Sequence, residues 1–283
     1  YARLDARSML GELQAGHDAK LAKTFKRSVA KARLNDGRRA LATLTHQVDG
    51  EPRIASEPPL IVPLAELAED DVQASIGATF RSYVHSLPQD RRVLLERFHC
   101  VDLARKVVGV GSVGTRCWIL LMLGRDDQDP LFLQIKEAEA SVLEPLVGAS
   151  GFASHAQRVV EGQRLMQATS DIFLGWVHAE RDLDGAPHDF YVRQLRDWKI
   201  SVDLEAILPR GLAYYAAACG WTLARAHARS GDRIAIAAYL GAGDRFDRAV
   251  AEFAAAYADL NEQDHRTLAQ AVADGEVTAL EGA

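Results

Sequence analysis

The sequence predicts an α+β fold, in which a small antiparallel-sheet lobe that contains one helix is joined to a mainly helical lobe. Short apolar runs rich in β-branched residues, each bounded by turn residues, gather at 99–200. Helical periodicity dominates residues 1–98 and 201–283. Because 283 residues can bury a substantial core, we expect an ordered helical segment, a small lobe and a helical lobe segment over these three ranges.

The first of these segments, 1–98, is expected to be helical except near its centre. Two amphipathic helices are predicted before about residue 47, and Asp49-Gly50 is expected to end them. Residues 53–63 are expected to be extended, because the pair Pro58-Pro59 excludes helix. Helical periodicity returns at 70–86 and 89–98.

The middle segment alternates between apolar runs and turn chemistry, which favours strands. One stretch with apolar residues at helical spacing interrupts it. The expected elements are a strand from about residue 101, strands at 117–123 and 131–136, a helix at 154–167, and strands at 171–177 and 189–195. In the last segment the alanine-rich pattern predicts helices at 211–229, 232–240 and 246 to about 273.

A glycine-rich segment, Gly109, Gly111, Ser112 and Gly114, separates the first two strands of the small lobe. In a dinucleotide-binding unit a helix would begin at the last glycine. Here an apolar strand, a turn and a second strand ending in Lys136 follow instead. The pattern predicts a glycine-closed hairpin whose backbone can lie over a triphosphate, with the lysine of the next strand contacting the phosphates.

This pairing of a glycine hairpin with a strand lysine is typical of kinases and differs from a Walker loop. The order strand, strand, strand, helix, strand, strand also matches the small lobe of a protein-kinase-like fold, where a glutamate of the helix pairs with the lysine. Glu161 is the leading candidate for that glutamate, and a solvated helix surface accounts for it nearly as well; Glu144 falls in an expected loop or short turn. Leu195 is the apolar residue expected beside the nucleotide base.

Composition limits the partners of the protein. The 33 Lys and Arg against 39 Asp and Glu give a formal net charge of -6, which argues against a general binder of nucleic acid or acidic membranes. Three scattered cysteines without a CxxC pair favour a reducing, cytoplasmic setting. No run reaches the roughly eighteen apolar residues of a membrane-spanning helix.

The chain resembles the bacterial domain of unknown function 2252 family, which looks distantly related to protein kinases and small-molecule kinases. The resemblance covers essentially the whole chain. The segments that carry it are Lys106-Val-Val-Gly-Val-Gly-Ser-Val-Gly-Thr-Arg116, Pro130-Leu-Phe-Leu-Gln-Ile-Lys-Glu137, Arg158-Val-Val-Glu-Gly-Gln-Arg-Leu-Met-Gln167, Asp189-Phe-Tyr-Val-Arg-Gln-Leu-Arg196 and Leu223-Ala-Arg-Ala-His-Ala-Arg-Ser-Gly-Asp232.

In that family a Gly-Asp-x-His-x-x-Asn motif and an Asp-Phe-Asp motif precede the glycine segment, and neither occurs in these 283 residues. The chain therefore resembles a C-terminal portion in a circularly permuted kinase-like order, against which an upstream segment is expected to pack. The resemblance implies ATP and Mg²⁺ as cofactors and an unknown phosphate acceptor. Asp232 is a weak candidate for a metal or acceptor contact, and a helix N-cap explains it at least as well. No metal ligand is assigned.

Three functions stay open from the sequence. The first is an ATP-binding module of a phosphotransferase, inactive by itself because the catalytic-loop motif is missing. The second is a pseudokinase or regulatory module that binds nucleotide or a partner protein and transfers nothing. The third is a Rossmann-type dinucleotide binder, which needs a helix directly after Gly114.

Overall fold

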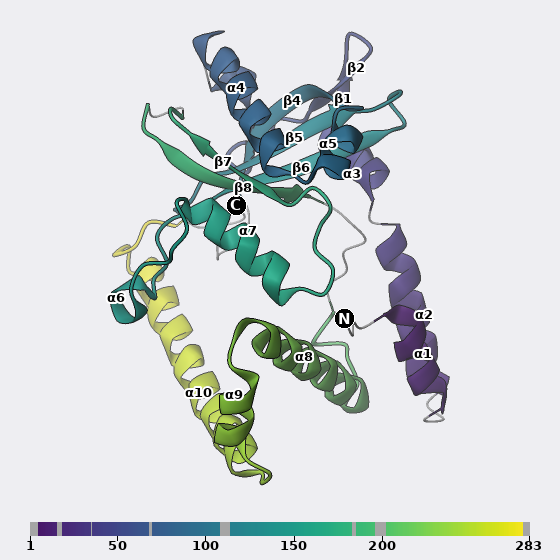
Figure 1. The fold of residues 1–283 in the computed structure, drawn as a ribbon, viewed down its shortest axis with the longest axis vertical. Helices are drawn as coiled ribbons and strands as arrows, with labels where there is room; N and C mark the ends of the chain where they lie inside the picture. Colours follow the sequence, from purple (N-terminus) through teal and green to yellow (C-terminus); the bar gives the residue numbers. More distant parts are fainter. Residues whose placement is uncertain are drawn as a thin grey trace. The chain divides into compact units, whose positions relative to one another are not determined.

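The computed structural model describes residues 5–15, 19–34, 36–67, 70–107, 114–182, 185–195 and 202–279. They form the predicted α+β fold, with helices before, within and after an antiparallel sheet (Figure 1). The chain divides into two compact units, Tyr1–Ala226 and His227–Ala283. The boundary expected near residue 98 falls inside the first unit, whereas the elements described in the second are all helices.

The main sheet has six antiparallel strands in the order β3-β4-β5-β6-β8-β7. Each strand predicted for the middle segment is present within a few residues of its expected bounds. The strands are β3 (Ile61–Pro63), β4 (His99–Lys106), β5 (Cys117–Leu123), β6 (Pro130–Glu137), β7 (Gly175–Ala179) and β8 (His188–Gln194).

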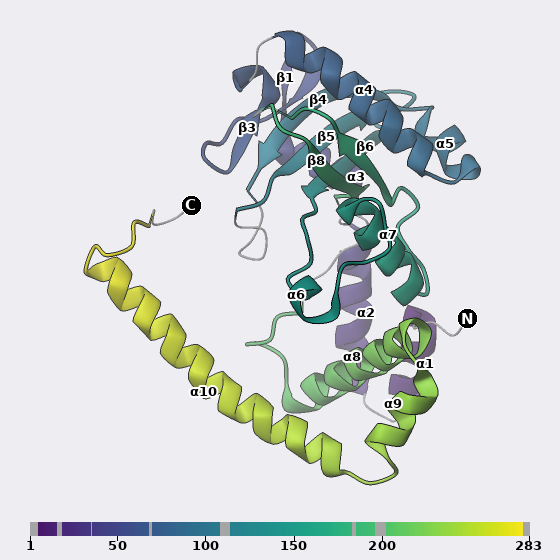
Figure 2. The ribbon, with the colours of Figure 1, turned by 60° about the vertical axis from the view of Figure 1, so that its left-hand side comes forward.

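The central strand β5 is buried along its whole length, because helices cover both faces of the sheet. Trp118, Leu120 and Met122 point to one side, where they pack in a cluster with residues of α4 (Asp70–Ser86) and α5 (Gln89–Leu95). We call this side the α4 face. Figure 2 shows α4 and α5 on one side of the sheet and α7 on the other.

The opposite side, the α7 face, is covered by two separate helices. At one end, α3 (Gly37–Leu44) packs against Ile119 and Leu121 of β5. At the other end, α7 (His155–Met166) packs on β7 and β8 and buries Ala156 and Val160. The Ser154 Oγ accepts a hydrogen bond from Gln157 N and caps α7, so the predicted helix at 154–167 is confirmed.

The N-terminal segment differs from its prediction in two respects. Its described residues before residue 47 form three helices rather than two: α1 (Ala6–Ala15), α2 (Ala19–Arg33) and α3, which Asp36 caps. Asp49-Gly50 does not end a helix but is the turn between β1 (Thr45–Val48) and β2 (Glu51–Ile54), with φ of 51° and 85°. Asp-Gly between short strands is a strong signal for a two-residue hairpin, and the helical interpretation overlooked it.

The remaining segments contain two short helices that the sequence did not predict. Residues 53–63 are extended or turn-like as predicted and lead into η1 (Leu64–Glu66), and the short α6 (Glu144–Val147) precedes α7. The C-terminal helices are α8 (Pro209–Ser230), α9 (Arg233–Leu240) and α10 (Arg245–Ala273). Among the described residues, no helix combines the length and apolar character needed to cross a membrane.

Candidate functional site

The glycine-rich segment joins the antiparallel strands β4 and β5, so the predicted hairpin is present. Gly109, Gly111 and Ser112 lie outside the described residues. Gly114 has φ of +85°, and a Cβ added there would meet no atom within 4 Å. A side chain would thus have room at this position, and the left-handed backbone is what favours glycine.

Lys136 lies on the next strand, close to where the glycine segment enters β5. Its register partner on β5 is Cys117 and its partner on β8 is Tyr191. Residues opposite one another in a ladder share a face of the sheet, so all three point to the α7 face. Lys136 is half-buried there, and its charge is close enough to affect the Cys117 thiol.

Two further cations lie near the same thiol. Burial raises the pKa of Cys117, while the positive charge of Lys136, a hydrogen bond from Gln134, and the charges of Lys106 and Arg193 all lower it. The Gln134 Nε2 lies 3.6 Å from the Cys117 Sγ. We call Lys106, Lys136 and Arg193 the basic cluster. Within the described part of the chain, the Arg193 Nε is buried and has no hydrogen-bond partner.

The residue after Lys136 fixes the end of the glycine segment to the sheet. One Glu137 oxygen accepts from the Arg116 backbone N–H at 2.8 Å, and the other pairs with the Arg116 guanidinium at 2.9 Å. His188 Nδ1 lies 2.8 Å from the same carboxylate, and Arg116 Nε lies 3.1 Å from Asp182. Glu137 is only 3% exposed. We call these four residues, Arg116, Glu137, Asp182 and His188, the Glu137 network. The sequence analysis did not identify it. The only indication in the sequence was a glutamate at a strand position that faces inward.

Glu161, the predicted partner of Lys136, lies on α7 and pairs with Arg164 on the same helix at 2.9 Å. That arginine also donates to the Leu174 carbonyl at 2.6 Å and lies over the Trp176 ring, 5.5 Å from its centroid. The pairing of Glu161 with Lys136 stays a prediction.

The other two predicted residues have structural contacts. Leu195 directly follows β8, donates its N–H to the Phe132 carbonyl at 2.9 Å and packs against the cluster on the α7 face. Asp232 lies in the second unit and caps α9, with its carboxylate accepting from Ile234 N at 2.9 Å and Ala235 N at 3.1 Å. The expected N-cap is confirmed, and a catalytic use of Asp232 stays a prediction.

The candidate site therefore combines the antiparallel pair β4 and β5 with the basic cluster on the α7 face. Comparison with family models matches residues 1–271 to the family described as "Uncharacterized protein conserved in bacteria (DUF2252)". The chain belongs to this family, as the sequence resemblance indicated. No curated protein and no solved structure matches it.

Proposed function

We propose that this chain is a kinase-like nucleotide-binding module in which the glycine segment covers the phosphates of ATP and Lys136 contacts them. The observation that carries the proposal is the position of Lys136. It lies opposite Cys117 in the β5–β6 ladder, and Cys117 comes three residues after Gly114 in the sequence. A lysine in this place brings a point charge close to any phosphate that the glycine backbone covers.

The basic cluster adds support. Three positive charges around one thiol favour an anion near them, and a phosphate chain is such an anion. The buried Arg193 Nε, without a partner in the described part of the chain, offers a directed donor to the same anion. ATP with Mg²⁺ is the ligand that we propose. The described residues contain no group of three or more His, Cys, Asp or Glu placed to hold a metal, so the proposal rests on the cations.

The arrangement of elements favours a kinase-like module over a Rossmann-type site. The strands β4, β5 and β6, helix α7, and the strands β7 and β8 follow in the order expected for a kinase-like small lobe. A Rossmann site needs a parallel sheet and a helix after the glycines. Here the sheet is antiparallel and the strand β5 comes next.

A non-catalytic nucleotide-binding role is the second candidate. Phosphoryl transfer needs an acidic group to orient the acceptor and acidic ligands for magnesium. The Gly-Asp-x-His-x-x-Asn and Asp-Phe-Asp motifs are not in the 283 residues, and the Asp232 carboxylate caps a helix. We therefore propose nucleotide binding for this chain, and phosphoryl transfer would need groups that do the work of these motifs.

Calorimetric titration of ATP with Mg²⁺ into wild type, Lys136→Ala and Lys31→Ala tests the proposal. Loss of a charge-assisted contact to phosphate should weaken binding by about tenfold or more in Lys136→Ala. Lys31, on the exposed surface of α2, is the matched control and should leave affinity unchanged. Equal affinity of Lys136→Ala and wild type would contradict the proposal. ADP release measured in the same samples would show turnover by this chain, whereas binding without release is the result expected from the missing catalytic-loop motif.

A further inference from the structure

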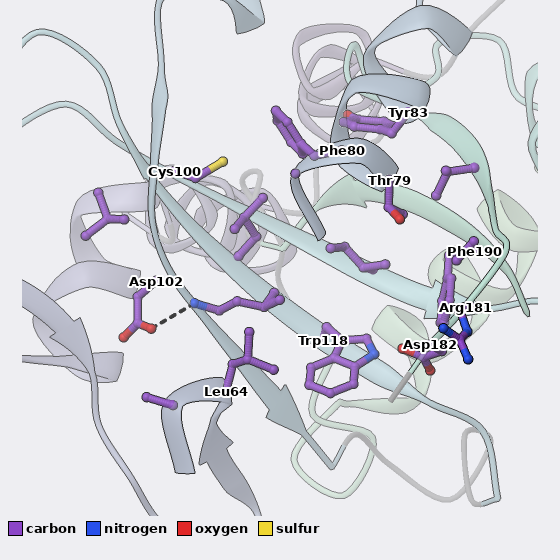
Figure 3. Close-up of a pocket in the computed structure, with 18 of the residues that line it drawn as sticks. Leu64, Thr79, Phe80, Tyr83, Cys100, Asp102, Trp118, Arg181, Asp182 and Phe190 are labelled. Carbon is purple, nitrogen blue, oxygen red and sulfur yellow. Dashed lines mark hydrogen bonds between the residues drawn. The ribbon is translucent and has the colours of Figure 1, made fainter. Parts of the chain in front are cut away.

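A cavity of about 700 Å³ lies between α4 and the sheet on the α4 face (Figure 3). Protein interiors are close-packed, and the voids that packing leaves are rarely much larger than a water molecule. A volume of this size is instead in the range of small-molecule sites. The cavity belongs entirely to the first compact unit.

Aromatic rings form much of its wall. Phe80 and Tyr83 come from α4, whereas Trp118 and Phe190 come from β5 and β8, as Figure 3 shows. The Tyr83 hydroxyl already donates to the Phe173 carbonyl at 2.7 Å. Tyr83 would therefore contact a ligand through its ring rather than through its hydroxyl. Rings and aliphatic side chains that line a cavity bind an apolar body by excluding water and by edge or face contact.

Charged residues line this apolar space at more than one place. Arg181 and Asp182 lie beside Phe190 in Figure 3. The Asp182 carboxylate is already 3.1 Å from the Arg116 guanidinium, which offsets its charge. Asp102, a further lining residue, accepts from the backbone N–H groups of Ile54 and Leu103. The exposed Arg181 places a positive charge at the Phe190 end of the cavity, whereas Asp102 lies across the cavity, on the side of Leu64.

From this geometry we infer a second binding site, on the α4 face, for a small amphipathic monoanion: an apolar aromatic or acyl body in the cavity and one carboxylate at Arg181. It is distinct from the proposed nucleotide site. Ile135 lines the cavity, and Lys136, the next residue of the same strand, points to the opposite face. The two sites can therefore be tested independently.

Tryptophan gives a reporter that is specific to this cavity. The chain has four tryptophans, of which Trp118 lies in the wall and Trp176 lies on the α7 face under Arg164. We would label the protein with 5-fluorotryptophan, assign the ¹⁹F resonances by single Trp→Phe variants, and titrate octanoate and 2-naphthoate separately. The expected result is a saturable shift of the Trp118 resonance with at least one of the two carboxylates, while the Trp176 resonance stays in place. No shift of Trp118 with either, or a shift only of Trp221 on α8, would overturn the inference.

Substitutions that fill the cavity with larger side chains test whether the ligand binds inside it. Ala179 and Ile135 both line it, so Ala179→Leu and Ile135→Phe should abolish the Trp118 shift, provided that each keeps the melting temperature of wild type within a few degrees. Two variants are used because either substitution can overpack the core and unfold the chain. A folded filled variant that shows the wild-type shift would overturn the inference.

The charged end has its own test. Arg181→Gln should weaken carboxylate binding by about threefold to tenfold, as expected for a partly exposed charge-assisted contact. Arg125→Gln, on the exposed turn after β5, should leave it unchanged. Octanol serves as the neutral analogue and should bind more weakly than octanoate. Equal binding of octanol and octanoate would overturn the assignment of an anion at Arg181.

Discussion

The strand β5 and the helix α10 are both rich in apolar residues, but they differ in what covers them. Every residue of β5 is buried, with Ile119 and Leu121 at 0% exposure. None of the described residues of α10 is buried, and Phe253 is 65% exposed. The apolar residues of α10 recur at intervals of three and four along one face: Phe246, Val250, Phe253, Tyr257 and Leu260.

Amphipathic pattern and core formation are therefore separate properties of a segment. An apolar stripe at helical spacing is enough to predict α10, yet it stabilises a helix only where another surface packs against it. The rings of Phe253 and Tyr257 stack on each other, 5.7 Å apart, in a contact within the stripe. A contiguous exposed patch of this kind is characteristic of an interaction surface or of an aggregation-prone one. We therefore expect substitutions in the sheet to change stability far more than the same substitutions in α10.

The largest effect is expected from the Glu137 network. Glu137→Gln removes the buried charge that pairs with Arg116, so that only Asp182 remains beside the guanidinium, and it should lower the free energy of unfolding by about 3–5 kcal/mol. The matched change is Glu262→Gln, which breaks an exposed pair with Arg266 on α10 and should cost no more than about 0.5 kcal/mol. Urea unfolding followed by tryptophan fluorescence measures both. Similar losses in the two variants would contradict the structural role given to Glu137.

Core packing gives the next comparison. Leu121→Ala opens a cavity in the centre of the sheet and should cost about 2–5 kcal/mol. Leu260→Ala makes the same chemical change on α10, where the side chain is 49% exposed, and should stay within about 0.5 kcal/mol. Chemical denaturation at several protein concentrations is the measurement. A large, concentration-dependent loss for Leu260→Ala would show that the stripe on α10 is covered in solution by a second copy.

The third comparison concerns the hydroxyl groups of a buried and an exposed tyrosine. Tyr83→Phe removes the donor to the Phe173 carbonyl and should cost about 1–2 kcal/mol, whereas Tyr257→Phe, at 54% exposure, should cost close to nothing. Burial, and then the charge of Asp171, raise the pKa of Tyr83 well above its ordinary value of 10. An unfolded chain would lose this proton above about pH 10 while the folded chain keeps it.

Folding stability should consequently fall as the pH rises above 10, and Tyr83→Phe should make that fall less steep. Urea unfolding between pH 8 and pH 11 checks the sign. An identical slope in wild type and Tyr83→Phe would show that Tyr83 ionises equally in both states.

The smallest effect is expected at the cap of α9. Asp232→Ala should destabilise this exposed helix locally by about 1 kcal/mol, and Asp232→Ser should restore most of the loss because a hydroxyl also caps. Hydrogen exchange at the amides of Ile234 and Ala235 reports the change. If any ATP turnover is found, its loss in Asp232→Ser with normal protection of these amides would instead assign the carboxylate a role beyond the cap.

Local pattern was sufficient for most of the secondary structure. The strand at 117–123 matches β5 at both ends, and the bounds of α7 and α10 differ from their predictions by one residue at most. These elements depend on the spacing of apolar residues and on caps, which a short window of sequence contains. The misjudged turn at Asp49-Gly50 also lay within such a window, and the turn chemistry there should have outweighed the expectation of a helix end.

The candidate sites could be predicted from the sequence less fully than the secondary structure, because they depend on the tertiary structure. The sequence identified Lys136 and the glycine segment, because a glycine-rich hairpin and a strand lysine are recognisable in order along the chain. It did not associate Lys106 and Arg193 with them, since these residues are 30 and 57 positions away and meet only through strand register. The aromatic cavity on the α4 face had no signal at all, because α4 and the strands that line it are separate in sequence.

From the sequence one can predict the class of fold, the succession of helices and strands, and a lysine on the strand after a glycine-rich hairpin. The tertiary structure decided which residues share a face of the sheet, where charges gather around Cys117, and where a cavity is left under α4. The physical reason is the range of the interactions involved. Helix and strand periodicity is set by neighbours a few residues apart, whereas register and packing join segments whose separation along the chain carries no information about their distance in space.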